Sequence, residues 1–166
     1  LTRPTADRVK EALFNVIQYE IRGEVLDLFA GTGQLGIEAL SRGAKHAVFV
    51  DRQTAAAALV RENLRRTHLT DRAEVVCSDY LAYLDRCTKR FDLIFLDPPY
   101  AEKSLETAIK RISEIDILAD GGIIITERPR GKELQADFPG LTRSRDYDYG
   151  KTTITLLRKE PREDIL

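Results

Sequence analysis

The sequence predicts an α/β fold in which helices cover both faces of a doubly wound, mostly parallel sheet that ends in an antiparallel hairpin. Two observations support this prediction. Short, almost continuously apolar runs alternate with helical stretches, which is typical of a parallel sheet buried on both faces. Later, two β-rich segments, 141–149 and 152–158, are joined by the tight turn Tyr149-Gly150-Lys151, which predicts a hairpin at the sheet edge.

The elements follow in order. An amphipathic helix is expected from Ala6 to Ile21, with Thr5 as a candidate N-cap and Gly23 as the stop. The predicted strands are 24–30, 46–51, 73–79, 91–97 and 121–127. The predicted helices are 36–42, 54–67, 80–87 and 103–115. A sheet of this kind binds its ligand at the carboxyl ends of the strands, near the switch in strand order.

Length and composition indicate one globular domain, 1–166, made of a leading helix segment (1–22), a core (23–160) and a frayed tail (161–166). The chain is 43% hydrophobic and 32% charged, and no apolar run approaches the roughly 20 residues of a membrane span. A net charge of −1 restricts any nucleic-acid site to a local patch. Cys77 and Cys87 are expected to be free thiols, and a cytoplasmic monomer with no metal is predicted.

The stretch DLFAGTGQLG, 27–36, stands where the first strand meets the next helix. Its glycines satisfy the dinucleotide pattern GxGxxG, so a nicotinamide cofactor, S-adenosylmethionine and a ligand-free turn all have to be considered. Asp27 favours adenosylmethionine, because a carboxylate beside the turn would repel a pyrophosphate but attract an ammonium and a sulfonium. Asp51, after the second strand, is expected to bind the ribose hydroxyls. Asp79 is expected to meet the adenine amino group, to cap the next helix, or both.

These considerations define a candidate cofactor set. It comprises Asp27, Phe29, Gly31, Thr32, Gly33, Asp51, Arg52, Asp79 and Tyr80.

The fourth strand stops at Asp97-Pro98-Pro99-Tyr100, where two prolines prevent both a continued ladder and an ordinary helical turn. With a methyl donor nearby, the Asp97 carboxylate and the Pro98 carbonyl can accept the two N–H groups of an exocyclic amine and orient its lone pair. Tyr100 can stack on the flat base. These four residues, Asp97, Pro98, Pro99 and Tyr100, form the candidate catalytic set. They resemble the [DN]PP[YF] signature of methyltransferases acting on adenine N6, guanine N2 or glutamine nitrogen.

The resemblance extends over nearly the whole chain. TRPTADRVKEALFNVI, LDLFAGTGQLGIEALSRGA, FDLIFLDPPY and YGKTTITL together resemble the RsmD-type family, which methylates guanine N2 in bacterial small-subunit (16S) ribosomal RNA. The resemblance implies a Rossmann-like class I methyltransferase fold, adenosylmethionine as donor, and ribosomal RNA or an assembling 30S particle as partner. The family's short basic segment before the RPT motif is absent from this sequence, and trimming of the chain is expected to explain this.

Several basic or polar residues are weaker candidates for RNA contact: Arg3, Thr5, Arg8, Arg128, Arg130 and Lys151. Two alternative functions stay open. One is an adenine-N6 methyltransferase, although no stretch is long enough for a separate target-recognition region. The other is a non-catalytic RNA-binding or assembly factor with the same fold, which the intact motifs disfavour. Glutamine methylation is less favoured because Asp97 stands where that chemistry usually has Asn.

Overall fold

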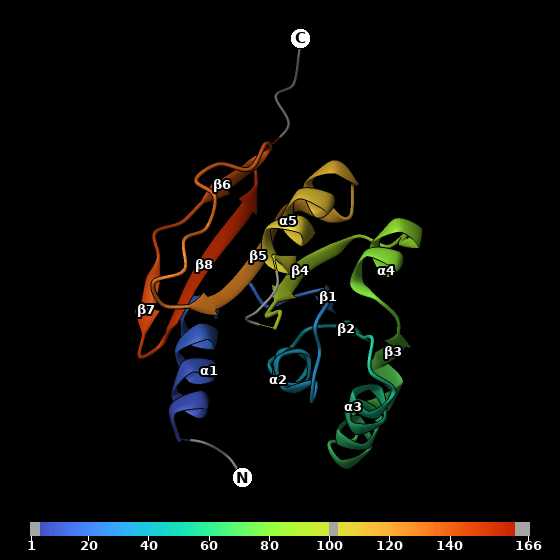
Figure 1. Ribbon diagram of the computed structural model, residues 1–166. Helices are drawn as coiled ribbons and strands as arrows, with labels where there is room; N and C mark the ends of the chain where they lie inside the picture. Colours follow the sequence, from blue (N-terminus) through green and yellow to red (C-terminus); the bar gives the residue numbers. More distant parts are fainter. Residues whose placement is uncertain (1–3, 100–102, 162–166) are drawn as a thin grey trace.

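The structure is a computed structural model that describes residues 4–99 and 103–161 (Figure 1). Three parts of the predictions lie outside the described residues: Arg3, Tyr100, and positions 162–166 of the tail predicted at 161–166. The helices are α1 (Pro4–Val16), α2 (Gln34–Ser41), α3 (Thr54–Arg66), the 3-10 turn η1 (Thr70–Arg72), α4 (Tyr80–Arg86) and α5 (Ser104–Glu114). The strands are β1 (Glu24–Asp27), β2 (His46–Asp51), β3 (Ala73–Cys77), β4 (Phe91–Leu96), β5 (Leu118–Pro129), β6 (Leu141–Arg143), β7 (Tyr147–Tyr149) and β8 (Thr152–Lys159).

These strands form one sheet in the order β3-β2-β1-β4-β5-β8-β6, and β7 also pairs with β8. The pairs from β3 across to β5 are parallel, whereas β8 runs antiparallel to β5, β6 and β7. The order reverses between β1 and β4, so a crevice is expected at the carboxyl ends of these two strands. The predicted fold class, including the C-terminal hairpin, is confirmed.

Helices cover both faces of the sheet, and each face has its own apolar core. On one face, α1, α2 and α3 contribute Leu13, Phe14, Leu40 and Leu64, among others, to a cluster with the strands. On the other face, α4 and α5 contribute Leu84 and Ile109, together with further apolar residues. Figure 1 shows the two groups of helices on opposite sides of the sheet. In the part of the chain that the structure describes, no helix is long and apolar enough to cross a membrane.

The first helix differs from its prediction at both ends. Thr5 lies inside the first turn of α1 and is therefore not its N-cap. The helix ends at Val16, five residues before the predicted end, because the chain turns there to enter β1. Ile17, just after the helix, is nevertheless fully buried. The helical spacing of apolar residues in this segment therefore predicted contact with the core correctly, but not the end of the helix. Gly23 takes a left-handed φ of 58°, and a Cβ there would lie 2.0 Å from the Asp92 carboxylate.

The segment predicted as one strand at 141–149 is two short strands. The interruption between β6 and β7 contains Ser144 and Asp146, whose side chains bind β8 and the neighbouring β5. The strand β5 is longer than predicted at both ends, because Leu118 pairs with β4 and β8 pairs with β5 as far as Pro129. The tertiary contacts of Asp146 therefore explain the break.

Candidate functional site

A pocket of about 640 Å³ opens at the carboxyl ends of β1, β2, β3 and β4, beside the reversal in strand order. Among the residues that the structure describes, its lining comes from the strand ends, the loops that follow them and the first turns of the adjoining helices. Of the candidate cofactor set, Phe29, Gly31, Thr32, Asp51, Arg52, Asp79 and Tyr80 line this pocket, as do Asp97, Pro98 and Pro99 of the candidate catalytic set. The structure thus brings together two motifs that are about sixty residues apart in the sequence.

The glycine turn after β1 has the backbone geometry that its residues predict. Gly31 and Gly33 take φ values of 58° and 83°, and Gly33 directly precedes α2. Gly36 has a different role, because a Cβ there would lie 2.4 Å from the Phe49 ring. It lets α2 pack closely on β2. The Asn63 side-chain amide donates to the Thr32 carbonyl at 2.8 Å and holds the turn from α3.

Asp51 connects the end of β2 to this turn. Its Oδ2 accepts a hydrogen bond from the Gly31 N–H at 3.0 Å, and its Oδ1 accepts one from the Gln53 N–H at 2.9 Å. A carboxylate has about four acceptor positions. Asp51 therefore retains the capacity to accept hydrogen bonds from a bound molecule.

The far side of the pocket combines an acid with two aromatic rings. Asp79 caps α4, since its Oδ2 accepts hydrogen bonds from the Leu81 and Ala82 N–H groups at 3.1 and 3.2 Å. The rings of Phe29 and Tyr80 lie with their centroids 5.0 Å apart and their planes at 45°. Rings in this arrangement offer an apolar surface to a flat heterocycle beside an acceptor for its amino group.

Asp27 lies apart from the pocket lining. Its side chain is buried, with 2% exposed, and its Oδ2 accepts a hydrogen bond from the Gly36 N–H at 3.1 Å. The pKa of Asp27 is raised to about 8, chiefly by burial; the Gly36 hydrogen bond opposes the rise, and the negative charges of Asp97 and Asp51 contribute to it. The structure therefore places Asp27 beneath the turn, where it fixes the first turn of α2. Gly33 also does not line the pocket and shapes it through the backbone.

Glu127, on β5, is a residue that the sequence analysis did not identify. Its side chain is hydrogen-bonded to that of Asp97. Burial, followed by the charge and hydrogen bond of Asp97 and the charge of Asp27, raises the pKa of Glu127 to about 9. Burial also raises the pKa of Asp97, although the hydrogen bond from Glu127 opposes the rise. The raised pKa values of both acids thus favour a state in which the two carboxyl groups share one proton.

The residues of the pocket fit S-adenosylmethionine. Acceptors at the ends of β2 and β3 match ribose hydroxyls and an amino group, and the rings of Phe29 and Tyr80 match adenine. A pyrophosphate fits less well, because the acids Asp51 and Asp97 line the pocket. Within the described ranges, no group of His, Cys, Asp and Glu is arranged to hold a metal ion. Cys77 and Cys87 are free thiols, as predicted.

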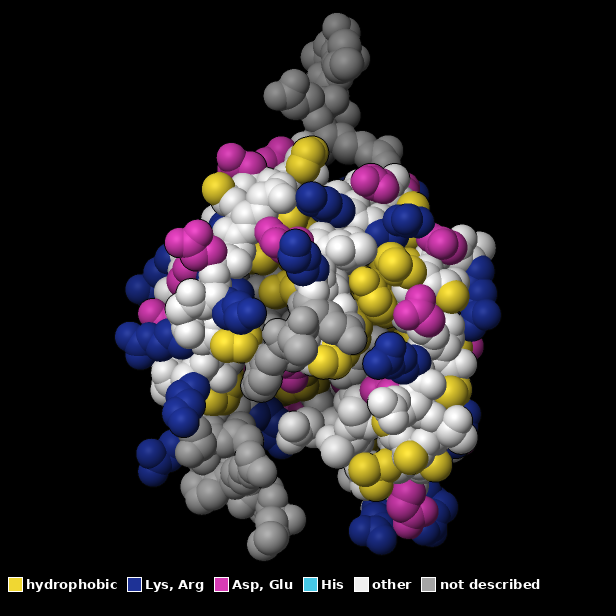
Figure 2. Space-filling model, viewed as in Figure 1, with side chains coloured by type: hydrophobic (Ala, Val, Ile, Leu, Met, Phe, Trp, Pro, Cys, Tyr) yellow, Lys and Arg dark blue, Asp and Glu magenta, His cyan; other side chains and the backbone are white. Residues whose placement is uncertain are grey.

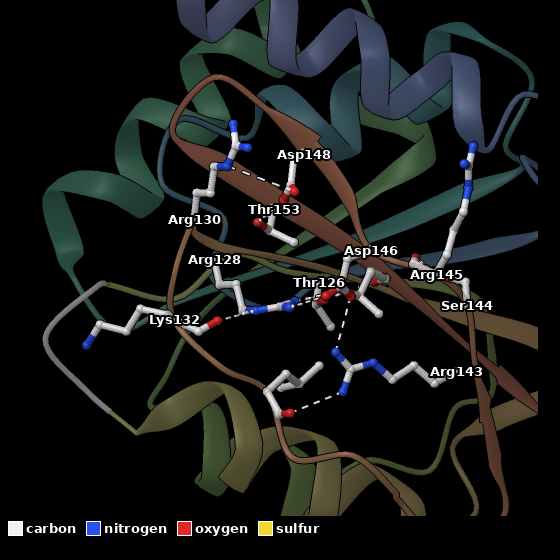
Figure 3. Close-up of polar contacts among 12 residues, drawn as sticks. Thr126, Arg128, Arg130, Lys132, Arg143, Ser144, Arg145, Asp146, Asp148 and Thr153 are labelled. Carbon is white, nitrogen blue, oxygen red and sulfur yellow. Dashed lines mark hydrogen bonds and ion pairs between the residues drawn. The ribbon is translucent and has the colours of Figure 1, made fainter.

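The weaker RNA-contact candidates separate into exposed and buried residues. Arg8, Arg130 and Lys151 are exposed. Arg128 is 7% exposed, and its guanidinium donates to the Lys132 carbonyl, the Thr155 hydroxyl and Asp146 at 2.8, 2.7 and 3.1 Å (Figure 3). All three of its nitrogens therefore bind within the protein. This internal role argues against the phosphate contact that the sequence suggested for Arg128.

Comparison with known sequences gives one family. The sequence profile of the family described as "Conserved hypothetical protein 95" matches residues 1–158. The "Putative rRNA methyltransferase YlbH" of Bacillus subtilis is 44% identical over 162 residues, covering 95% of this chain and 88% of the relative. The "Ribosomal RNA small subunit methyltransferase D" of Haemophilus influenzae is 39% identical over 136 residues, covering 80% of this chain and 70% of the relative.

Solved structures agree with this result. The structure titled "Putative methyltransferase yhhF from Escherichia coli" superimposes with a TM-score of 0.86 at 32% identity, covering 96% of this chain and 88% of that one. A conserved hypothetical protein from Streptococcus pyogenes superimposes with the same TM-score at 33% identity, covering 91% and 95%.

Proposed function

The chain belongs to the conserved hypothetical protein 95 family, which confirms its resemblance to RsmD-type proteins, and from that premise we propose that it methylates ribosomal RNA with S-adenosylmethionine as donor. The finer proposal is that the acceptor is the exocyclic N2 of one guanine in bacterial small-subunit (16S) RNA. The observation that supports transfer to an amino nitrogen is the shared pocket, which Asp97-Pro98-Pro99 lines together with the glycine turn, the acids and the aromatic rings.

The donor is held by residues of three strand ends. Asp51 accepts hydrogen bonds from the ribose hydroxyls as well as from the Gly31 N–H. Asp79, which caps α4, accepts a hydrogen bond from the adenine amino group. Phe29 and Tyr80 contact the adenine ring. When bound there, adenosylmethionine supplies an electrophilic methyl group on a positively charged sulfur. Asp27 acts indirectly: it fixes the start of α2 by accepting the hydrogen bond from the Gly36 N–H.

Asp97 orients the nitrogen that is methylated. Its carboxylate accepts one N–H of the guanine amino group, the Pro98 carbonyl accepts the other, and the stiff Pro98-Pro99 segment keeps both acceptors in place. In the transfer, the nitrogen lone pair would bond to the methyl carbon as the bond from that carbon to sulfur breaks, with the electron pair of the broken bond staying on sulfur. Asp97 stabilises the positive charge that develops on nitrogen and takes the released proton. Guanine N2 lies in the minor groove of an RNA helix, so the base must be unpaired or flipped out to enter the pocket.

RNA binding is assigned to a local basic region. Figure 2 shows several Lys and Arg side chains along the edge of the molecule where β7 and β8 lie in Figure 1. Arg130 and Lys151 are exposed next to the β7–β8 turn, and Arg145 lies over the Tyr147 ring at 4.5 Å. Cations beside an aromatic ring suit phosphates and unstacked bases. A local patch of this kind is compatible with the net charge of −1.

The experiment is tritium transfer from labelled adenosylmethionine onto small-subunit RNA and 30S particles that lack methylation, followed by digestion to nucleosides and chromatography. Label in N2-methylguanosine is expected, and the better substrate identifies the assembly state that is recognised. Label in N6-methyladenosine would replace the guanine proposal with an adenine-N6 enzyme. Binding of both donor and RNA with no transfer to either substrate would favour an assembly factor.

A further inference from the structure

A second, smaller cavity lies next to the proposed acceptor site. Its volume is about 140 Å³, and Pro98 and Pro99 line both this cavity and the large pocket. The remaining lining comes from the start of α5 and from β5 with the loop that follows it. It includes Lys103, Leu105, Glu127, Lys132 and Leu134. The two prolines thus stand between the proposed donor pocket and a cavity with Glu127 in its wall.

Strand pairing explains why Glu127 meets Asp97. The parallel strands β4 and β5 are in register up to Leu96 and Thr126, so the next residue on each strand is the acid of this pair. Their side chains are hydrogen-bonded to each other. Among the residues at 4–99 and 103–161, no arginine or lysine lowers the pKa of either acid. The pair is therefore suited to hydrogen-bond donors that come from outside the protein.

The neighbours of Glu127 on β5 point to the other side of the strand. The Thr126 hydroxyl donates to the Thr155 carbonyl at 2.9 Å, and Arg128 binds Asp146 and Thr155 (Figure 3). Arg128 also holds the Lys132 carbonyl, which belongs to the cavity wall. These contacts immobilise β5 and the following loop around Glu127. The Glu127 carboxyl is thus held at the cavity by a rigid strand. A group that recognises a ligand requires such support.

We propose that Glu127 is a specificity-determining residue that recognises the Watson–Crick edge of the target guanine, accepting N1–H while Asp97 accepts N2–H. This inference rests on the proposed function. Guanine presents two adjacent donors on this edge, N1–H and the N2 amino group, and two neighbouring carboxyl groups offer matching acceptors. Adenine presents an N1 lone pair in the same position, which would face a carboxyl oxygen. The pair therefore selects guanine over adenine.

The network is complete when Glu127 is neutral. Its hydroxyl donates to the Asp97 carboxylate, and its carbonyl oxygen is then the acceptor for guanine N1–H. Glutamine can reproduce this pattern, because its amide nitrogen donates to Asp97 and its amide oxygen accepts from the base. Alanine removes both contacts. The Glu127→Gln and Glu127→Ala variants therefore form a matched pair.

The test uses RNA fragments that contain the methylated guanine once it has been mapped, or 2-aminopurine in its place. 2-Aminopurine keeps the N2 amino group but has a lone pair at N1. The wild-type protein is expected to prefer guanine over 2-aminopurine by roughly 10- to 100-fold in kcat/KM. Glu127→Gln should keep most of the activity on guanine. Glu127→Ala should reduce that activity and bring the preference close to one.

Equilibrium binding of the same two fragments without donor gives a second readout, in which the preference for guanine should also disappear only in Glu127→Ala. A thermal melt of each variant tests folding.

An unchanged preference in folded Glu127→Ala would overturn the inference and leave the proposed function intact. A loss of activity in Glu127→Gln equal to that in Glu127→Ala would also overturn it, because the charge of Glu127 would then be what matters. Absence of guanine-N2 methylation by the wild-type protein would instead refute the proposed function.

Discussion

The Asp51 carboxylate and the Gly31 N–H are joined by a hydrogen bond of 3.0 Å, which ties the end of β2 to the glycine turn after β1. Asp51 thus serves the protein and the proposed donor at once. We expect Asp51→Ala to weaken adenosylmethionine binding by roughly 10- to 100-fold, since a charged hydrogen bond contributes about 1.5 to 3 kcal/mol. Isothermal titration calorimetry measures this, with Asp71→Ala, an exposed acid outside the pocket, as control. Equal affinity in the two variants would contradict the assignment.

Asp97 should affect transfer and not donor affinity. Asp97→Ala is expected to lower kcat by roughly 100-fold or more, because it removes an acceptor that stabilises the charge developing on nitrogen. Asp97→Asn keeps one acceptor oxygen and should retain more activity than Asp97→Ala. Single-turnover transfer and calorimetry on the same variants separate the two effects. Loss of donor binding in Asp97→Ala as large as in Asp51→Ala would show that the roles have been assigned wrongly.

Arg128 and Arg130 are two residues apart but should behave differently. Arg128→Ala leaves Asp146 without its buried partner and frees the Lys132 carbonyl, so we expect a loss of roughly 2 to 4 kcal/mol in the free energy of unfolding. Arg130 is exposed and lies 3.9 Å from Asp148, so Arg130→Ala should cost less than about 0.5 kcal/mol. Urea denaturation compares the two. Similar losses would contradict the internal role of the contacts that Arg128 makes in Figure 3.

The same exposed residue gives a prediction about RNA. If Arg130 contacts a phosphate, Arg130→Ala should weaken binding to small-subunit RNA and lower the slope of log affinity against log salt by about one. Lys151→Ala should act similarly, because it adjoins the same β7–β8 turn. Filter binding at several salt concentrations measures the slope. Exposed Arg61, on α3, supplies the control, and an equal change in Arg61→Ala would argue against a local patch.

Asp27 should make stability depend on pH. Its pKa is about 8 in the folded protein because of burial, whereas an unfolded Asp titrates near pH 4. Between these values the folded state holds a proton that the unfolded state lacks, so this contribution to stability is lost as pH rises toward 8. Asp27→Asn cannot ionise and keeps an oxygen for the Gly36 N–H. Its stability relative to the wild type should therefore increase from pH 5 to pH 8.

Denaturation curves across this range check the sign. Asp71→Asn, at an exposed position, should show a constant difference from the wild type. A difference for Asp27→Asn that does not change with pH would mean that Asp27 stays ionised in the folded protein.

Local pattern was sufficient for much of the fold and of the candidate site. The strand HAVFVD was predicted with its observed bounds, because a continuous apolar run has a single favourable position in a sheet covered on both faces. The turn Tyr149-Gly150-Lys151 needed only a glycine with positive φ between two β-rich segments. The positions of Asp51, Asp79 and Asp97 after successive strands followed in the same way, since the carboxyl ends of parallel strands meet at one edge.

Burial and long-range pairing decided the rest. Nothing in the letters TERPR distinguishes Glu127 from a solvated acid or Arg128 from a phosphate contact. The difference arises from strand pairing with positions about thirty residues away in the sequence. The end of β4 places Asp97 beside Glu127, and β8 places Thr155 beside Arg128. The raised pKa values of Asp27 and Glu127 likewise depend on removal from water. The sequence by itself determined the order of the elements and the strand-end motifs through local chemistry, and only the tertiary structure decided which side chains share a low-dielectric environment.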